Sequence, residues 1–227
     1  MVKTVTKRFL NGAETAAGIV VIIDVFRSSN TILMFLARGA SSVIPVMTIE
    51  DALKLKQKHP DYILAGEREG IKVRGFDMGN SPYEASRMEL DGKRVILTTS
   101  GGTQVIRRTT QAQQIVIGSF GNAQALINML TMIDPPLVTW LSVGTGAVSD
   151  AVEDDLCALY LQGTLKRSPQ DFETIRSKIL KGDGANRLRR LKQENDFFYC
   201  LGVDIFDFVP ILADQGDVMG FVKQWKV

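Results

Sequence analysis

The chain has little of the material from which several kinds of protein site are built. It contains two cysteines, Cys157 and Cys200, and a single histidine, His59. Two cysteines far apart, with no Cys-x-x-Cys pair, exclude a disulfide scaffold, and we expect both thiols to be free and buried in a reducing compartment. One histidine leaves almost no material for a Ser-His-Asp triad or a histidine-ligated metal.

An excess of charge and a long apolar run are also missing. Lys and Arg number 27 against 25 Asp and Glu, which leaves a net charge of +2. This balance gives no reason to expect a nucleic-acid or membrane partner. The longest apolar stretch, residues 19–26, is broken by Asp24, and the first 18 residues have no apolar signal core. We therefore expect a cytoplasmic protein.

Short β-branched runs alternate with amphipathic segments along most of the 227 residues. This alternation predicts a three-layer α/β/α fold with a largely parallel or mixed central sheet, because the strands are apolar on both faces. Length and composition favour one domain, residues 1–227, or two closely packed lobes of about 1–135 and 136–227. Pro210 predicts an edge position for the last strand, residues 206–212. The predicted strands are 18–24, 43–47, 62–65, 94–97, 115–117, 137–143 and 206–212.

Unusual polar residues follow four of these strands. They occupy residues 24–31, 66–68, 98–103 and 144–155. Ligands of α/β sheets bind outside the carboxyl ends of the strands, so these four segments predict one site.

Asp24 ends an otherwise apolar strand, where a carboxylate is costly unless it is paired or binds a cation. Two readings stay open. Arg27 neutralises Asp24 in a structural salt bridge, or Asp24 holds a divalent cation while Arg27 binds a phosphate or sulfonate through its planar fork.

The segment 98–103, Thr-Thr-Ser-Gly-Gly-Thr, is rich in glycine and hydroxyl groups just before a predicted helix. Such a loop can present backbone N–H groups to an anion, or it is an ordinary capped turn. It matches neither the P-loop nor the dinucleotide fingerprint. Glu153 and Asp154 offer hard oxygen ligands of the kind that Mg²⁺ prefers, or they form a solvated acidic helix start.

Residues 64–68, Leu-Ala-Gly-Glu-Arg, and 75–82, Gly-Phe-Asp-Met-Gly-Asn-Ser-Pro, with Glu84, carry a resemblance. This block resembles the GER…GFDxGNSPxE signature of the 2-phosphosulfolactate phosphatase (ComB) family. Residues 24–27 with Thr31, the 98–103 loop, and Glu153-Asp154 with Cys157-Ala158 resemble further motifs of that family. The chain departs from the pattern at Gly101 and Gln104, where the family has Asn and Arg.

The resemblance implies a Mg²⁺-dependent phosphatase that hydrolyses (2R)-2-phospho-3-sulfolactate to 3-sulfolactate and phosphate, a reaction of coenzyme M biosynthesis. The predicted catalytic residues are Asp24, Arg27, Glu67 and Arg68. Metal ligands are expected among Asp24, Glu67, Asp77, Glu153 and Asp154. Substrate or phosphate binding is assigned to Ser28, Thr31, Asn80, Ser81, Thr98, Thr99, Ser100, Gly101, Gly102 and Thr103.

Several alternatives stay open at this point. Asp24 or Glu67 orients an attacking water, or Asp24 forms an aspartyl-phosphate. Gly101 and Gln104 leave room for a phosphatase of a different small phosphorylated hydroxy acid, and a non-catalytic phosphoanion-binding protein is a third interpretation. A homodimer is the expected assembly for a soluble enzyme.

Overall fold

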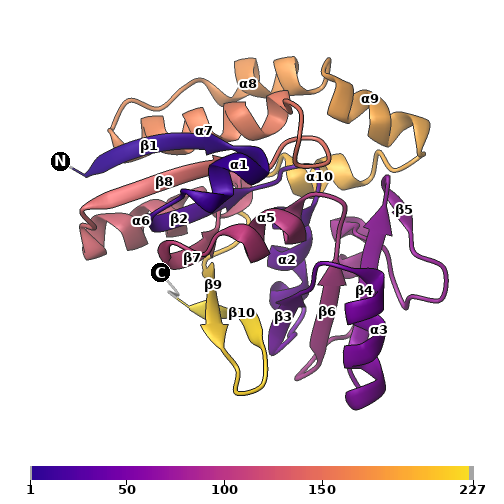
Figure 1. Ribbon diagram of the computed structural model, residues 1–227. Helices are drawn as coiled ribbons and strands as arrows, with labels where there is room; N and C mark the ends of the chain where they lie inside the picture. The colour runs from indigo at the N-terminus through magenta and orange to yellow at the C-terminus, as the bar shows by residue number, and fades with distance from the viewer. Residues whose placement is uncertain (1, 225–227) are drawn as a thin grey trace.

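Two blocks of parallel strands lie in one ten-stranded sheet (Figure 1). The computed structural model describes residues 2–224. The first block contains, in spatial order, β1 (Lys3–Arg8), β8 (Leu137–Ser142), β2 (Gly18–Ile23) and β7 (Ala112–Ile117). The second block contains β3 (Ser42–Pro45), β6 (Arg94–Thr98) and β4 (Ile63–Arg68), and a short β5 (Ile71–Lys72) pairs antiparallel with the end of β4.

An antiparallel hairpin, β9 (Val209–Asp214) and β10 (Met219–Gln224), joins the two blocks. β9 meets β7 at the pair Val116 and Ile211, and β10 meets β3 at Phe221 and Val43. The predicted edge position of Pro210 is therefore wrong, because β9 lies inside the sheet. The ladder between β7 and β9 is confined to one residue pair, so a missing proline N–H disrupts little regular pairing there.

Helices cover both faces of the sheet, as the apolar strands require. Val20 and Ile22 of β2 belong to one hydrophobic core, and Ile19, Val21 and Ile23 belong to another. The first core packs under α1 (Phe9–Glu14), α2 (Ser28–Ala37), α4 (Pro82–Ser86) and α5 (Gly102–Arg108). The second packs under α6 (Ala123–Ile133), α7 (Val152–Leu165), α8 (Phe172–Ile179) and α9 (Asp183–Arg190). This arrangement confirms the α/β fold with three layers.

The remaining elements complete these layers. α3 (Ile49–Lys58) covers a third core on the second block, while the short helices η1 (Phe120–Asn122) and α10 (Asp196–Cys200) lie near the other cores. Two helix starts follow from the sequence directly: Thr48 accepts the N–H of Asp51 at 3.0 Å, and Ser81 caps α4 ahead of Pro82.

The sequence does not indicate β1, because Val5 is the one apolar residue of Lys3–Arg8; the strand lies at the edge of the sheet and, within residues 2–224, pairs with β8 alone. Both cysteines are buried and free, as expected. Among residues 2–224, the helices are too short or too polar to cross a lipid bilayer.

Candidate active site

The four predicted segments meet at one end of the sheet. Asp24 follows β2, Glu67 lies in β4, Ser100 follows β6 and Gly144 follows β8, and all four line one small cavity of about 50 Å³. The chain leaves β2 here and crosses through α2 from the first block to the second. Ligands of α/β sheets bind outside the carboxyl ends of the strands, at points where the connections diverge. The other lining residues are Phe26, Arg27, Glu69, Gly70, Asn80, Gly101, Gly146 and Arg187.

Asp24 is the central carboxylate of this cavity. Its backbone N–H donates to Ser29 Oγ at 2.9 Å, which fixes the turn after β2. The pKa of Asp24 is raised from 3.8 to about 6, chiefly by burial and also by the charges of Glu67 and Glu153, against the opposing effects of the Ser28 N–H and Arg187. A carboxyl group that titrates near neutral pH in a cleft is typical of an active site.

Asp154 holds two of the turns together. Its Oδ1 accepts the N–H of Val25 at 2.8 Å and its Oδ2 accepts the N–H of Gly144 at 2.8 Å. Burial, followed by the charges of Asp24 and Glu153, raises the pKa of Asp154 well above its usual range. The side chain therefore joins the turns after β2 and β8, and its charged form is disfavoured by burial and by the neighbouring Asp24.

Two buried polar atoms at the site have no hydrogen-bond partner within residues 2–224. They are Oδ1 of Asn80, which lines the cavity, and Oε2 of Glu153, a residue that is 2% exposed. Glu153 lines a neighbouring cavity and lies near enough to Asp24 for its charge to raise the pKa of Asp24. Leaving such a group unpaired costs about 1–3 kcal/mol, so each atom indicates a place for a ligand. Burial raises the pKa of Glu153, and Arg187 opposes this rise.

The oxygen donors fit a hard divalent cation. Glu153 is close enough to Asp24 for its charge to raise the pKa of Asp24, and one oxygen of Glu153 is unpaired. In the part of the chain that is described, no three Asp, Glu, His or Cys side chains form a complete metal-binding group. That is compatible with Mg²⁺, which is usually held by one or two carboxylates and completes its shell with water and phosphate oxygens.

Arg27 is held in place by acceptors from distant parts of the chain. Its Nη1 donates to Gln193 Oε1 at 2.7 Å and to Asp196 Oδ2 at 2.9 Å, and its Nη2 donates to Gly70 O at 2.9 Å. Asp196 is fully buried, and its Oδ1 accepts Ser81 Oγ at 2.6 Å. We call these five residues, Arg27, Gly70, Ser81, Gln193 and Asp196, the arginine clamp. The salt bridge to Asp24 that the sequence left open is thus formed with Asp196 instead.

Glu67 and Arg68 also make internal contacts. Glu67 accepts the N–H of Ser100 at 2.7 Å on Oε1 and the N–H of Gly70 at 2.6 Å on Oε2. Arg68 donates to Glu67 O at 2.6 Å and to Thr98 Oγ1 at 2.9 Å. Glu67 therefore lines the cavity with both oxygens engaged, and Arg68 supports the end of β6 from outside the lining.

The 98–103 loop reaches the cavity in part. The N–H of Thr99 donates to Thr103 Oγ1 and the N–H of Thr103 donates to Thr99 Oγ1, both at 3.0 Å, so these amides are already used. Ser100 and Gly101 line the cavity, and Gly102 lies so near that a Cβ atom would be 2.8 Å from Asp24 Oδ2.

Other predicted residues lie away from the cavity lining. Thr31 is buried within α2 and donates to Arg27 O at 3.1 Å, and Ser28 is buried at the start of the same helix. Asp77 accepts the N–H of Leu64 at 2.7 Å and lies 3.8 Å from Lys56 Nζ. The structure therefore does not bring Asp77 together with the other carboxylates.

Four polar or charged residues of the site were not predicted: Glu69, Arg187, Gln193 and Asp196. In the sequence, the basic run 187–192 is typical of a solvated helix face. Arg187 instead lines the cavity, and its Nη2 donates to Phe26 O at 3.1 Å. The sequence signal is Gly184, a glycine one turn before Arg187; in the structure a Cβ atom there would overlap Glu153 Oε1. A glycine at that position lets α9 lie directly on the site.

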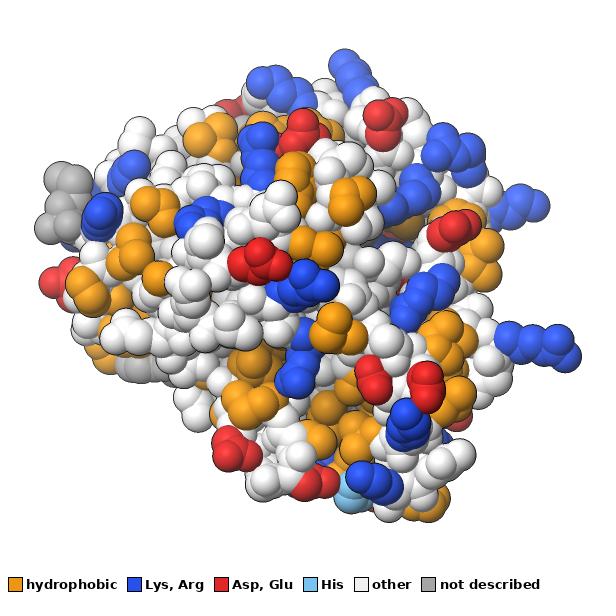
Figure 2. All heavy atoms as spheres, in the orientation of Figure 1, with side chains coloured by type: hydrophobic (Ala, Val, Ile, Leu, Met, Phe, Trp, Pro, Cys, Tyr) orange, Lys and Arg blue, Asp and Glu red, His pale blue; other side chains and the backbone are white. Residues whose placement is uncertain are grey.

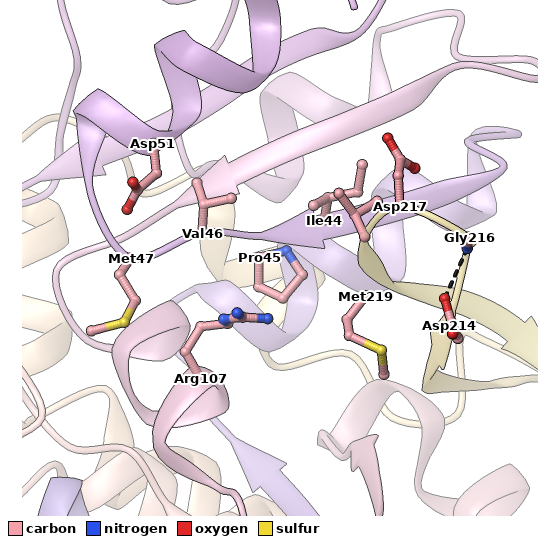
Figure 3. A pocket seen from close by; sticks show the side chains of 11 residues that line it. Ile44, Pro45, Val46, Met47, Asp51, Arg107, Asp214, Gly216, Asp217 and Met219 are labelled. Atoms are coloured by element: carbon pink, nitrogen blue, oxygen red, sulfur yellow. Dashed lines mark hydrogen bonds between the residues drawn. The ribbon is translucent and has the colours of Figure 1, made fainter. Parts of the chain in front are cut away.

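A larger cavity of about 490 Å³ lies elsewhere, between the end of β3 and the β9–β10 turn. Figure 3 shows Asp51 and Arg107 on one side of it and Asp214 and Asp217 on the other. The carboxylates of this cavity have partners: Asp51 accepts Thr48 Oγ1, Asp214 accepts the N–H of Gly216, and Asp217 pairs with His59 at 3.0 Å. The smaller cavity instead has an unpaired buried oxygen in its lining, Oδ1 of Asn80, and it is the better candidate for chemistry.

Buried carboxylates and arginines at the strand ends of a three-layer α/β sheet define an enzyme of small anionic molecules. Residues 5–215 match the model of the 2-phosphosulpholactate phosphatase family. The chain belongs to this family, and it is accordingly a hydrolase of the phosphatase class.

Curated relatives agree with that assignment. A protein of Thermotoga petrophila named probable 2-phosphosulfolactate phosphatase is 37% identical over 207 residues, which cover 86% of this chain and 88% of the relative. Proteins of the same name from Clostridium novyi and Clostridium beijerinckii are 32% and 30% identical, over 84% and 86% of this chain and 87% and 89% of the relatives.

Proposed function

We propose that the protein hydrolyses (2R)-2-phospho-3-sulfolactate to 3-sulfolactate and phosphate with the help of Mg²⁺. The observation that carries this proposal is the cavity where Asp24, titrating near pH 6, lies near the unpaired oxygen of Glu153 and the guanidinium of Arg187. Family membership supports the substrate. We further propose that the reaction serves a pathway of the coenzyme M type in the cytoplasm.

Asp24 is the residue that we propose orients the attacking water and takes its proton. In the metal-free protein its pKa of about 6 leaves it largely ionised at pH 7, which both a metal ligand and a group that orients a water require. Glu67, the other candidate, already accepts hydrogen bonds from Ser100 and Gly70 on its two oxygens. A water on Asp24 therefore has fewer competing donors than a water on Glu67.

The phosphoryl group would lie beside Ser100, Gly101 and Asn80, which border the cavity. Gly101 has no side chain to obstruct that approach. The unpaired Oδ1 of Asn80 is a hydrogen-bond acceptor, so it suits a bound water or a cation beside the phosphoryl group. Asp24 and Glu153 are the residues that would hold Mg²⁺. When bound, the metal would neutralise charge on the phosphoryl oxygens and lower the pKa of a bound water.

A different phosphorylated hydroxy acid remains a second candidate substrate because of two departures from the family pattern. Gly101 borders the cavity without the side-chain amide of the family's Asn. Gln104, where the family has Arg, donates its amide to Met47 O and is not among the cavity residues.

The experiment is a phosphate-release assay on a panel of phosphorylated three-carbon acids, with Mg²⁺ or with EDTA. We expect the highest kcat/KM on 2-phospho-3-sulfolactate and loss of turnover in EDTA. Full turnover in metal-free buffer would contradict the role of Mg²⁺, and a higher kcat/KM on a non-sulfonated acid would select the second substrate.

Asp24→Asn tests the site itself. It removes the charge at nearly constant size, and we expect kcat/KM to fall at least ~100-fold, a barrier change of about 3 kcal/mol. Asp77→Asn is the matched control, an identical change outside the cavity, and should keep kcat/KM within about twofold. Equal losses in the two variants would remove Asp24 from the catalytic role.

A further inference from the structure

The cavity is lined by several acidic side chains, which repel an anionic substrate unless cations are present. Asp24, Glu67 and Glu69 all line it, and Glu153 lies close to Asp24. A substrate with a phosphate and further acid groups needs a cation for each part that enters this field. Bound Mg²⁺ would serve the phosphate, which leaves the remaining acid groups to the protein's own cations.

Two arginines line the cavity, and only one has donors to spare. Arg27 is 4% exposed and donates to three acceptors of the arginine clamp. Arg187 is partly buried, and within residues 2–224 its hydrogen bonds are limited to Phe26 O. A guanidinium carries five N–H donors, so most donors of Arg187 remain for a ligand.

Arg187 also reaches the cavity from the side opposite the position that we propose for the phosphate. The 98–103 loop leads into α5, whose Val105 and Ile106 pack in the core on one face of the sheet. Arg187 comes from α9, whose Ala185 and Leu188 pack in the core on the other face. Asp24 lies between them, near Gly102 on one side and within the electrostatic influence of Arg187 on the other.

The position of Arg187 is built into the packing of α9. Gly184 lies against Glu153 so closely that a side chain would not fit, and Arg187 follows three residues later on the same face of the helix. The bond to Phe26 O then fixes one edge of the guanidinium over the turn that carries Asp24.

From these contacts we propose that Arg187 is a specificity-determining residue that binds an acid group of the substrate other than the phosphate. This inference rests on the proposed function. In 2-phospho-3-sulfolactate that group is the sulfonate or the carboxylate, and a planar guanidinium binds either through paired N–H donors.

The test compares wild-type enzyme with Arg187→Met on three phosphate esters. They are 2-phospho-3-sulfolactate, 2-phospholactate, which lacks the sulfonate, and 2-phosphooxypropane-1-sulfonate, which lacks the carboxylate. We expect Arg187→Met to lower kcat/KM about 10- to 100-fold on the full substrate and at most about threefold on the ester that lacks the bound group. The insensitive ester identifies that group.

Two further variants separate this role from a general one. Arg187→Lys keeps the charge without the fork and should recover part of the loss. Arg190→Met removes an exposed arginine of the same helix and should match wild type on all three esters. An equal loss on all three esters with Arg187→Met would mean that Arg187 acts on the phosphate or on the fold, and no loss on any would mean that it binds nothing. Either result overturns the proposal.

Calorimetry measures the binding of 3-sulfolactate, with lactate as the comparison ligand that lacks the sulfonate. This measurement tests the inference without requiring turnover. If wild type releases no phosphate, the proposed function fails. The proposed role of Arg187 still holds if wild type binds 3-sulfolactate at least tenfold more tightly than Arg187→Met does. If wild type neither turns over the esters nor binds 3-sulfolactate, both proposals fall.

Discussion

The arginine clamp lies next to a carboxylate cluster, which consists of Asp24, Glu153 and Asp154. The charges of the clamp are paired within the protein, whereas part of the charge of the cluster is left without a partner. In the clamp, Arg27 meets Asp196 at 2.9 Å, and the other oxygen of Asp196 accepts Ser81. In the cluster, carboxylates of like charge are gathered, their pKa values are raised, and Glu153 keeps an unpaired oxygen. A charge satisfied by the protein serves stability, whereas a charge left unsatisfied is available to a ligand.

Figure 2 shows how local this contrast is. Lys and Arg side chains are scattered over the visible surface and are interspersed with Asp and Glu, in keeping with the net charge of +2. The imbalance that matters for function is confined to the small cavity.

The largest expected effect breaks the clamp. Arg27→Met leaves Asp196 buried without its cation, and we expect the free energy of unfolding to fall by about 3–5 kcal/mol. Urea unfolding measures this, with Arg187→Met as the matched control, because Arg187 forms no ion pair within the described chain and should cost about 1 kcal/mol or less. The double variant Arg27→Met/Asp196→Leu should recover part of the loss. Equal stabilities of the two single variants would remove the distinction between clamp and cluster.

A smaller effect is expected from pH, and it tests the cluster. The folded pKa of Asp24, about 6, lies above the unfolded value of 3.8, so the folded protein binds more protons between these values. Stability should therefore be highest below about pH 4 for this group and fall as pH rises to about 6–7, by about 2–3 kcal/mol at most.

Urea melts in EDTA from pH 4.5 to 7.5 measure this slope. Asp24→Asn should flatten it and should be more stable than wild type at pH 7.5. A wild-type stability that rises over the same range in proportion to Asp24 ionisation would show that the carboxylate is satisfied within the protein.

The smallest effect concerns Asp77, a carboxylate satisfied by the protein but near the surface. Asp77→Asn keeps an acceptor for the N–H of Leu64 and loses the ion pair with Lys56, so stability should fall by about 0.5–1 kcal/mol. The same urea assay at pH 7.5 measures it. A loss of more than about 3 kcal/mol in the free energy of unfolding would show that Asp77 stabilises the fold as strongly as the arginine clamp does.

The part of the site that the sequence predicts is the part made by local patterns. A buried strand that ends in Asp24, or a turn at 98–103 before a helix, is visible within ten residues, and parallel strands then bring such ends together. Asp196 pairs with Arg27 across most of the chain, and nothing near either residue specifies the partner. Arg187 lies in a basic run that resembles any solvated helix face. It differs from the other basic residues of the run in following Gly184, which packs against Glu153, by three residues.

The same limit applies to the fold. The apolar strands of the interior were predicted, because burial on both faces leaves a continuous hydrophobic run. β1 was not, because its residues are polar on the exposed side, and β10 was not, because its pairing with β9 and β3 depends on strands remote in sequence.

The β9–β10 hairpin has a consequence for how the protein is made. The hairpin provides the strand-to-strand pairing between the two parallel blocks, and it is the last part of the sheet to leave the ribosome. The cavity takes Asp24 from one block and Glu67 and Ser100 from the other, so the sheet that connects its two walls is completed late in synthesis. Folding governed by such non-local contacts is slow. During that interval the nascent chain carries the carboxylates of the site but not yet the enclosed cavity that raises their pKa values.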